Sequence, residues 1–86
     1  MKVVLATPLI DYTEGAREVH AAGATLDAVL HDLDRQFPGI RFRMIDEQQR
    51  VRPHIKFFVD RELCRELATD VSTVKEMLVV AALSGG

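Results

Sequence analysis

Apolar positions near the N-terminus follow the two-residue period that is typical of β-strands. Residues 3–5 read Val-Val-Leu, a composition that favours a strand, and Pro8 ends the run. Residues 18–21 alternate polar and apolar side chains, as a half-buried strand does, and Gly23 breaks this second run. The polar residues 11–15 between the runs predict a turn. The first third of the chain is therefore expected to form a β-hairpin.

The next segment, residues 26–36, has the period of an amphipathic helix. Thr25 is a suitable N-cap, because its hydroxyl can accept a hydrogen bond from the first turn. Asp27 lies where negative charge stabilises the helix dipole, and Pro38 with Gly39 ends the helix. The apolar stripe that must pack on another layer comprises Leu26, Val29, Leu30, Leu33 and Phe37.

Two alternatives fit the segment after this helix. Phe42, Met44 and Ile45 indicate either a short second helix or an irregular packed segment, and the polar residues 46–50 predict an exposed loop. The sequence then predicts a hairpin and a connection: a strand at 55–59, a tight turn at 60–62, a short strand at 63–65 and a linking segment at 67–74.

Residues 77–83 are apolar at every position, which is typical of a central strand covered on both faces. One face is expected to pack against the helix, and the other is available to a partner. The order of elements predicts an α+β roll, a mixed sheet of four to five strands with one main helix packed across it. We expect a single domain over residues 1–83 and a flexible tail at residues 84–86.

Composition limits the possible classes of function. The chain has 86 residues, 48% of them hydrophobic, and a net charge of -2 without a basic block, so a nucleic-acid partner is not expected. No apolar run approaches the ~18 residues of a membrane span, and Pro8 and Asp11 interrupt the N-terminal run, so neither a span nor a signal peptide is expected. Cys64 is the single cysteine, which fits a reducing cytoplasm.

The histidine and phenylalanine positions bear on possible metal and partner sites. His20, His31 and His54 lie far apart without a second cysteine, so no metal site is expected. Phe57 and Phe58 must point to opposite faces of their strand. One is expected in the core, and the other in an exposed apolar patch with Leu78 or Val80. The pattern leaves open which phenylalanine faces outward.

The sequence ends in Ser84-Gly85-Gly86. Glycine lacks a Cβ, so such a segment can lie extended in a narrow channel and allow close approach of a nucleotide. It also presents an unhindered carboxylate, which becomes reactive when it is activated as an acyl-adenylate. The alternative is an ordinary frayed terminus.

Four segments are distinctive when they are taken together: Ala24-Thr25-Leu26, Phe37-Pro38-Gly39-Ile40, Phe57-Phe58-Val59-Asp60-Arg61-Glu62 and Leu83-Ser84-Gly85-Gly86. These segments resemble the MoaD/ThiS family of ubiquitin-like sulfur carriers, especially its longer CysO-like and small archaeal-type modifier members. The resemblance covers essentially the whole chain. Asp60-Arg61 departs from the usual Asn-Gly or Asn-Asp of the family, and Thr73-Val74-Lys75 replaces a common Asp-Gly-Asp/Glu turn.

This resemblance implies a β-grasp fold and a carrier that is not itself an enzyme. An adenylating activating enzyme, MoeB/ThiF-like, would use ATP to activate the Gly86 carboxylate, and a sulfur donor would convert it to a thiocarboxylate. The carrier would then supply sulfur to an acceptor enzyme, and the domain itself would bind no cofactor. The residues expected to contact partners are Leu83, Ser84, Gly85, Phe58, Leu78 and Val80.

Other interpretations remain open at the level of sequence. The sequence leaves the acceptor pathway open among cysteine, molybdopterin, thiazole and other metabolites, and the long middle segment, residues 41–53, favours the cysteine-type or modifier-type members. A second interpretation is a protein modifier that is conjugated to its targets through Gly86. A third interpretation is a non-catalytic interaction domain or small regulatory subunit with an inert tail.

Overall fold

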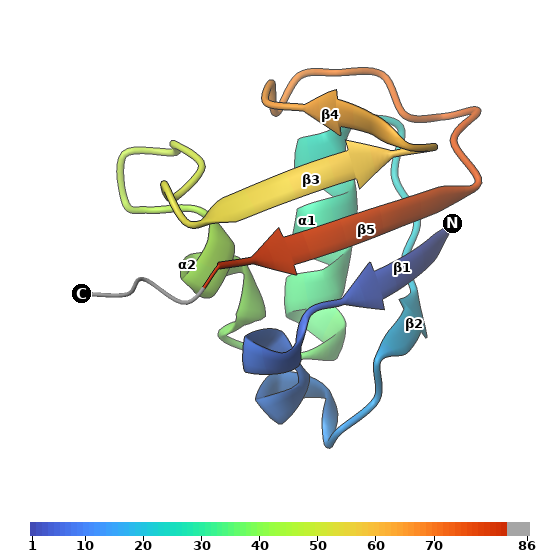
Figure 1. The fold of residues 1–86 in the computed structure, drawn as a ribbon. Coiled ribbons are helices and arrows are strands. Elements are labelled where there is room, and N and C mark those ends of the chain that lie inside the picture. The colour runs from blue at the N-terminus through green and yellow to red at the C-terminus, as the bar shows by residue number, and fades with distance from the viewer. Residues whose placement is uncertain (83–86) are drawn as a thin grey trace.

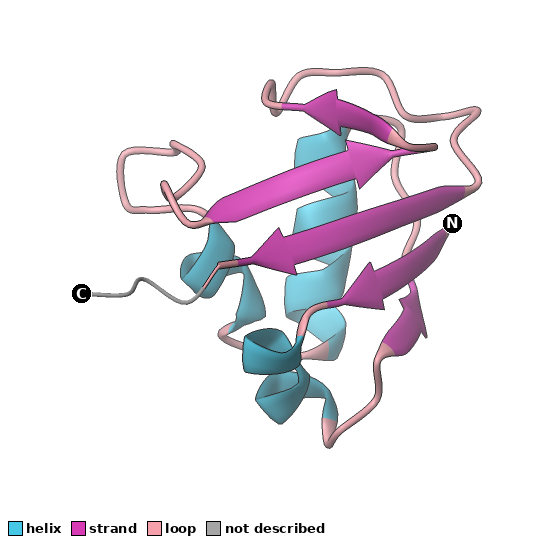
Figure 2. Cartoon of the chain, viewed as in Figure 1, coloured by secondary structure: helices cyan, strands magenta, loops and turns pink. Residues whose placement is uncertain are grey.

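The computed structural model describes residues 1–82 and leaves residues 83–86 outside the description. Its strands form one sheet in the order β2-β1-β5-β3-β4, and helix α1 crosses one face of that sheet (Figures 1 and 2). The strands are β1 (Lys2–Leu5), β2 (Glu18–His20), β3 (Ile55–Val59), β4 (Glu62–Cys64) and β5 (Glu76–Ala81).

Strand β5 occupies the centre of the sheet, as its apolar sequence predicts. It pairs in parallel with β1 on one side, where Val4 lies opposite Leu78, and antiparallel with β3 on the other. The strand ends at Ala81, before the predicted end at residue 83. The sheet is therefore mixed, with five strands, and the expected α+β architecture is confirmed.

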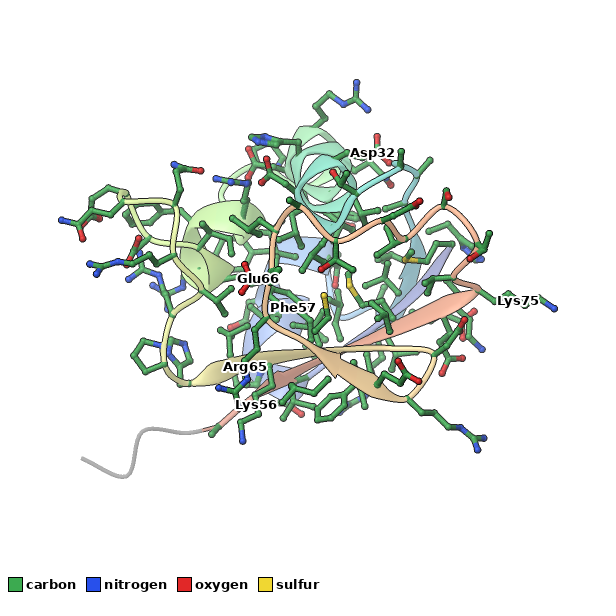
Figure 3. The ribbon with its side chains drawn as sticks, turned by 90° about the horizontal axis from the view of Figure 1, so that it is seen from above. Asp32, Lys56, Phe57, Arg65, Glu66 and Lys75 are labelled. Carbon is green, nitrogen blue, oxygen red and sulfur yellow. The ribbon has the colours of Figure 1, made fainter. Side chains whose placement is uncertain are left out.

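Helix α1 (Leu26–Gln36) has the predicted bounds. The Thr25 Oγ1 accepts a hydrogen bond from the Ala28 N–H at 3.1 Å, which confirms the predicted N-cap. The predicted stripe is fully buried except for Phe37, which packs at the margin of the core. Phe57 points from the sheet toward this helix and is fully buried (Figure 3). The core thus lies between α1 and the inner face of the sheet.

Two segments differ from a simple hairpin-and-loop arrangement. A 3₁₀ helix, η1 (Thr7–Thr13), occupies most of the connection between β1 and β2, where we expected a turn at residues 11–15. Its last residue, Thr13, is buried, with its hydroxyl 3.1 Å from the Ile10 carbonyl oxygen and 2.6 Å from that of Ala16. The second segment is α2 (Ile40–Met44), so the short helix is the correct one of the two alternatives.

The β3–β4 connection is a tight turn without glycine. Asp60 and Arg61 both have positive φ angles, 47° and 75°, as a type I′ hairpin turn requires. The Asp60 carboxylate also accepts hydrogen bonds from the backbone N–H groups of Lys75 (3.3 Å) and Glu76 (3.2 Å). An aspartate here therefore fixes the turn against the start of the central strand, and β4 begins at Glu62, one residue earlier than predicted.

Candidate functional site

An apolar row of side chains crosses the sheet on the face opposite α1. Val4 pairs with Leu78, Leu78 with Phe58, and Phe58 with Leu63, so the row runs through four neighbouring strands. Leu78 is 38% exposed and Leu63 43% exposed, whereas the neighbouring residues Phe57 and Val79 are buried. Phe58 is thus the phenylalanine that faces outward, which answers the question that the sequence left open.

The predicted patch residues Phe58, Leu78 and Val80 do share this face. Leu78 and Val80 are two residues apart on β5, and Val80 lies opposite Lys56 on β3. Sequence reasoning missed two members of the row, Val4 and Leu63. Val4 alternates with the buried Val3 and Leu5, which indicates an outward side chain, but its contact with β5 depends on a register that the sequence does not specify.

Charged side chains border the row on both sides. On one side the Lys2 ammonium lies 3.0 Å from a Glu76 carboxylate oxygen and 3.8 Å from one of Glu18. The hydrogen bond and charge of Glu76, and then the charge of Glu18, raise the pKa of Lys2 above its ordinary value. On the other side Lys56 carries an exposed ammonium group. The face therefore combines an apolar centre with a charged rim, a composition common at transient protein interfaces.

The C-terminal segment begins beside this face. The Ala82 N–H donates a hydrogen bond to the His54 carbonyl at 2.8 Å, just beyond the Ile55–Ala81 pair that ends the β3–β5 ladder. The last described residue is therefore held against the start of β3. The predicted site residues Leu83, Ser84, Gly85 and Gly86 lie outside the described residues.

The other features considered in the sequence were possible metal ligands, Cys64 and a membrane span. Within residues 1–82 there is no group of three or more His, Cys, Asp or Glu side chains placed to hold a metal ion. Cys64 is buried, and its Sγ lies 3.7 Å from the Glu66 carbonyl oxygen. The helices in the described part of the chain are all too short or too polar to cross a membrane.

The comparisons with known proteins show close similarity to sulfur carriers. No family model matches the chain. The sulfur carrier protein CysO of Mycobacterium tuberculosis is 31% identical over 93 aligned residues, which cover 100% of both sequences. The crystal structure of M. tuberculosis CysO has a TM-score of 0.87 at 29% identity, and the two chains are covered to 95% and 98%.

Two further structures extend this similarity. The Amycolatopsis orientalis BexX/CysO complex matches with a TM-score of 0.88 at 26% identity, covering 99% of this chain and 98% of the other. SAMP1 from Haloferax volcanii matches with a TM-score of 0.77 at 23% identity over 99% and 97% of the chains, which shows a shared fold. From its ubiquitin-like β-grasp fold and its full-length similarity to CysO, the chain belongs to the CysO-like sulfur carriers of the MoaD/ThiS family.

Proposed function

We propose that the chain carries sulfur as a thiocarboxylate on Gly86 and supplies it to an enzyme that forms cysteine. The observation that carries this proposal is the similarity to CysO, which extends over the whole of both sequences and therefore includes the Gly85-Gly86 end. The single cysteine, Cys64, is unpaired, which supports action in a reducing cytoplasm.

The chemistry begins on a partner enzyme, because a carboxylate is a poor electrophile. An adenylating enzyme of the MoeB/ThiF type joins a Gly86 carboxylate oxygen to the α-phosphorus of ATP and releases pyrophosphate. A sulfur nucleophile then attacks the Gly86 carbonyl carbon and displaces AMP. The resulting thiocarboxylate sulfur is a better nucleophile than a carboxylate oxygen, and within the acceptor enzyme it bonds to a substrate carbon as a leaving group departs from that carbon. Hydrolysis of the resulting thioester then releases the thiol product and restores the Gly86 carboxylate. The ATP belongs to the partner, and the domain itself binds no cofactor.

The C-terminal residues 83–86 supply the length that carries the Gly86 carboxylate into a partner's active site. Four fully extended residues span at most about 14 Å, which is enough to enter a buried active site while the folded domain stays outside. The hydrogen bond between Ala82 and His54 fixes the point where that span begins. Gly85 and Gly86 allow a narrow channel, and Leu83 and Ser84 are proposed to contact its entrance.

The exposed face of the sheet supplies the surface that binds the partner protein. We assign partner binding to the apolar row and to Val80, because an exposed apolar surface with a charged rim is typical of interaction sites. Phe58 and Leu78 lie opposite each other at the centre of this surface and are the proposed anchors. The BexX/CysO complex is consistent with a carrier of this fold that docks on a partner protein.

The test is ATP–pyrophosphate exchange with an adenylating enzyme from the same source. The full chain is expected to support exchange, because formation of the acyl-adenylate is reversible. A chain that ends at Gly85 tests whether the Gly86 carboxylate is needed, and Phe58→Ala tests whether the apolar row is needed for docking. Exchange that is equally fast with the shortened chain would refute a role for the Gly86 carboxylate.

A further inference from the structure

A basic cleft opens at the edge of the sheet, where β4 separates from β3. Its volume is about 620 Å³, within the range that binds ligands or short peptide segments. The cleft lies between the loop at residues 49–53 and the segment at residues 63–68, with the start of β3 as its floor. Ile55 and Cys64 are its buried apolar members, and Val51 and Leu67 are half-buried.

Positive charge is concentrated in this cleft although the chain has a net charge of -2. The lining includes one acidic residue, Glu66, against four basic residues: Arg50, Arg52, Lys56 and Arg65. Figure 3 shows Lys56 and Arg65 projecting at the same end of the sheet, far from Lys75. The cleft is therefore a local concentration of positive charge, suited to binding a negatively charged group, and not part of a uniformly basic surface.

The basic residues differ in how far they are already neutralised. Arg50 lies 3.7 Å from the Asp46 carboxylate, and the Arg52 guanidinium stacks 4.6 Å from the centre of the Phe42 ring while its Nε donates to the Phe42 carbonyl. Lys56 and Arg65 have no ion-pair partner within residues 1–82. These two side chains are consequently the best placed to bind a carboxylate from outside.

The backbone around the cleft suits an extended polypeptide. The β3–β5 ladder continues to Ile55, but the β3–β4 ladder stops at the pair of Phe57 and Cys64. The first part of β3 therefore has a strand on one side and the cleft on the other. β4 is also an edge strand, so its outer side has no strand neighbour in the described chain. Edges of this kind accept an added strand through main-chain hydrogen bonds.

We propose that this cleft binds an extended acidic segment of a partner protein. The segment places an apolar side chain over Ile55 and Leu67, and its carboxylates bind Lys56 and Arg65. Charge complementarity selects an acidic partner, and the interrupted β3–β4 ladder selects an extended one. This site adjoins the apolar row at Leu63, which borders both, and at Lys56, which belongs to the rim of the apolar face and to the lining of the cleft.

The test begins with a random ten-residue peptide display library selected on the immobilised full-length chain. The peptide that binds most tightly is synthesised with blocked ends and titrated into ¹⁵N-labelled protein. We expect an acidic peptide with at least one large apolar residue, and amide shifts concentrated at residues 49–56 and 63–68. Selection of non-acidic peptides only, or shifts confined to the apolar row, would overturn the proposal.

Matched charge reversals locate the site. The double variant Lys56→Glu with Arg65→Glu is expected to weaken binding by at least about tenfold, because two cations become repulsive. The control double variant, Arg61→Glu with Lys75→Glu, makes the same change in net charge away from the cleft and is expected to leave the affinity unchanged. Equal weakening by both variants would mean nonspecific attraction and would overturn the proposal. Urea unfolding of both variants verifies that they are folded.

Three further titrations distinguish an external peptide from other occupants of the cleft. Sodium phosphate and AMP are titrated alone, and binding of either one as tightly as the peptide would assign the cleft to a small anion instead. A chain that ends at Ala82 is expected to bind the peptide with unchanged affinity. Tighter binding by that shortened chain would show that the chain's own C-terminal residues compete for the cleft, which also contradicts an external partner.

Discussion

The backbone N–H of Ala82 donates to the carbonyl of His54 at 2.8 Å, so the end of the central strand is fixed to the residue that precedes β3. The two residues are 28 positions apart in the numbering of the chain, and neither bears a reactive side chain that the proposed chemistry uses. Their contact matters because it sets the position and direction from which the C-terminal segment departs. A carrier whose reactive group is at the end of that segment depends on this point of departure.

Replacement of Ala82 by proline tests this dependence, because proline has no N–H to donate. We expect Ala82→Pro to lower the free energy of unfolding by about 1 kcal/mol, the usual contribution of one hydrogen bond. Adenylation of the chain should slow more than this small loss explains, since the start of the segment is no longer fixed. Urea unfolding and pyrophosphate exchange measure the two effects. Unchanged exchange would show that the anchor is irrelevant to activation.

Phe57 and Phe58 provide a matched pair that separates stability from binding. Phe57 is fully buried, so Phe57→Ala should cost about 3–5 kcal/mol of unfolding free energy by leaving a cavity. Phe58 faces outward in the apolar row, so Phe58→Ala should cost much less and should instead weaken partner binding by tenfold or more. Denaturant unfolding and calorimetric titration with the activating enzyme measure these quantities. Wild-type affinity in Phe58→Ala would exclude the apolar row as the docking surface.

The contrast between these two residues shows what the sequence can predict. The bounds of α1 and β3 follow from local signals, namely the Thr25 cap, the periodic stripe and the run of residues 55–59. The direction of Phe58 depends on the register of β3 against β5, which is set by residues far away in the sequence. The same holds for Val4 and Leu63 in the apolar row.

The 3₁₀ helix and the basic cleft were also beyond sequence reasoning. η1 buries Leu9 and Thr13 and contacts α2 and β5, which come later in the chain, so its helical turns are favoured by tertiary contacts more than by propensity. The cleft exists because β4 leaves β3 after one short ladder. No local pattern marks that separation, and the four basic residues that gather there are spread over residues 50–65.

Gly23 has a packing role in addition to ending the second strand. A Cβ at this position would lie 2.6 Å from the Val29 nitrogen and 2.7 Å from the Ala28 carbonyl carbon, which are backbone atoms of α1. We expect Gly23→Ala to destabilise the fold by about 1–3 kcal/mol, because the helix must shift. Thermal unfolding measures the loss.

Gly15 is the matched control for that substitution. It has a φ of 88° and open space around it, so Gly15→Ala introduces backbone strain without a clash. A smaller loss, of about 1 kcal/mol, is expected. If the two variants lose equal stability, close packing against α1 is not the reason that position 23 requires glycine.

Asp32 makes the stability of the fold depend on pH in the acidic range. The backbone N–H of Ala22 donates to its carboxylate at 2.9 Å, and this hydrogen bond, followed by that of Arg35, lowers the pKa of Asp32 below its ordinary value of 3.8. Because the folded-state pKa is lower than the unfolded one, the stabilisation is complete above the ordinary value and is lost as the pH falls through the folded-state pKa. Asp32→Asn should therefore flatten the decline in stability below about pH 4.

Urea unfolding across this pH range measures the effect. The pKa values of Asp46 and Asp70 are also lowered, mainly by hydrogen bonds from Arg50 and Ser72, so part of the acid dependence should remain in the Asp32 variant. A pH profile identical to that of the wild type would show that Asp32 contributes nothing to it.

The central claim is that Gly86 carries sulfur, and intact mass measures it most directly. The chain is incubated with ATP, sulfide and its adenylating enzyme, beside a chain that ends at Gly85. We expect a mass increase equal to replacing one oxygen atom by sulfur, located on Gly86 by fragmentation and absent from the shortened chain. An unchanged mass, under conditions in which the same enzyme forms the acyl-adenylate of the full chain, would contradict it.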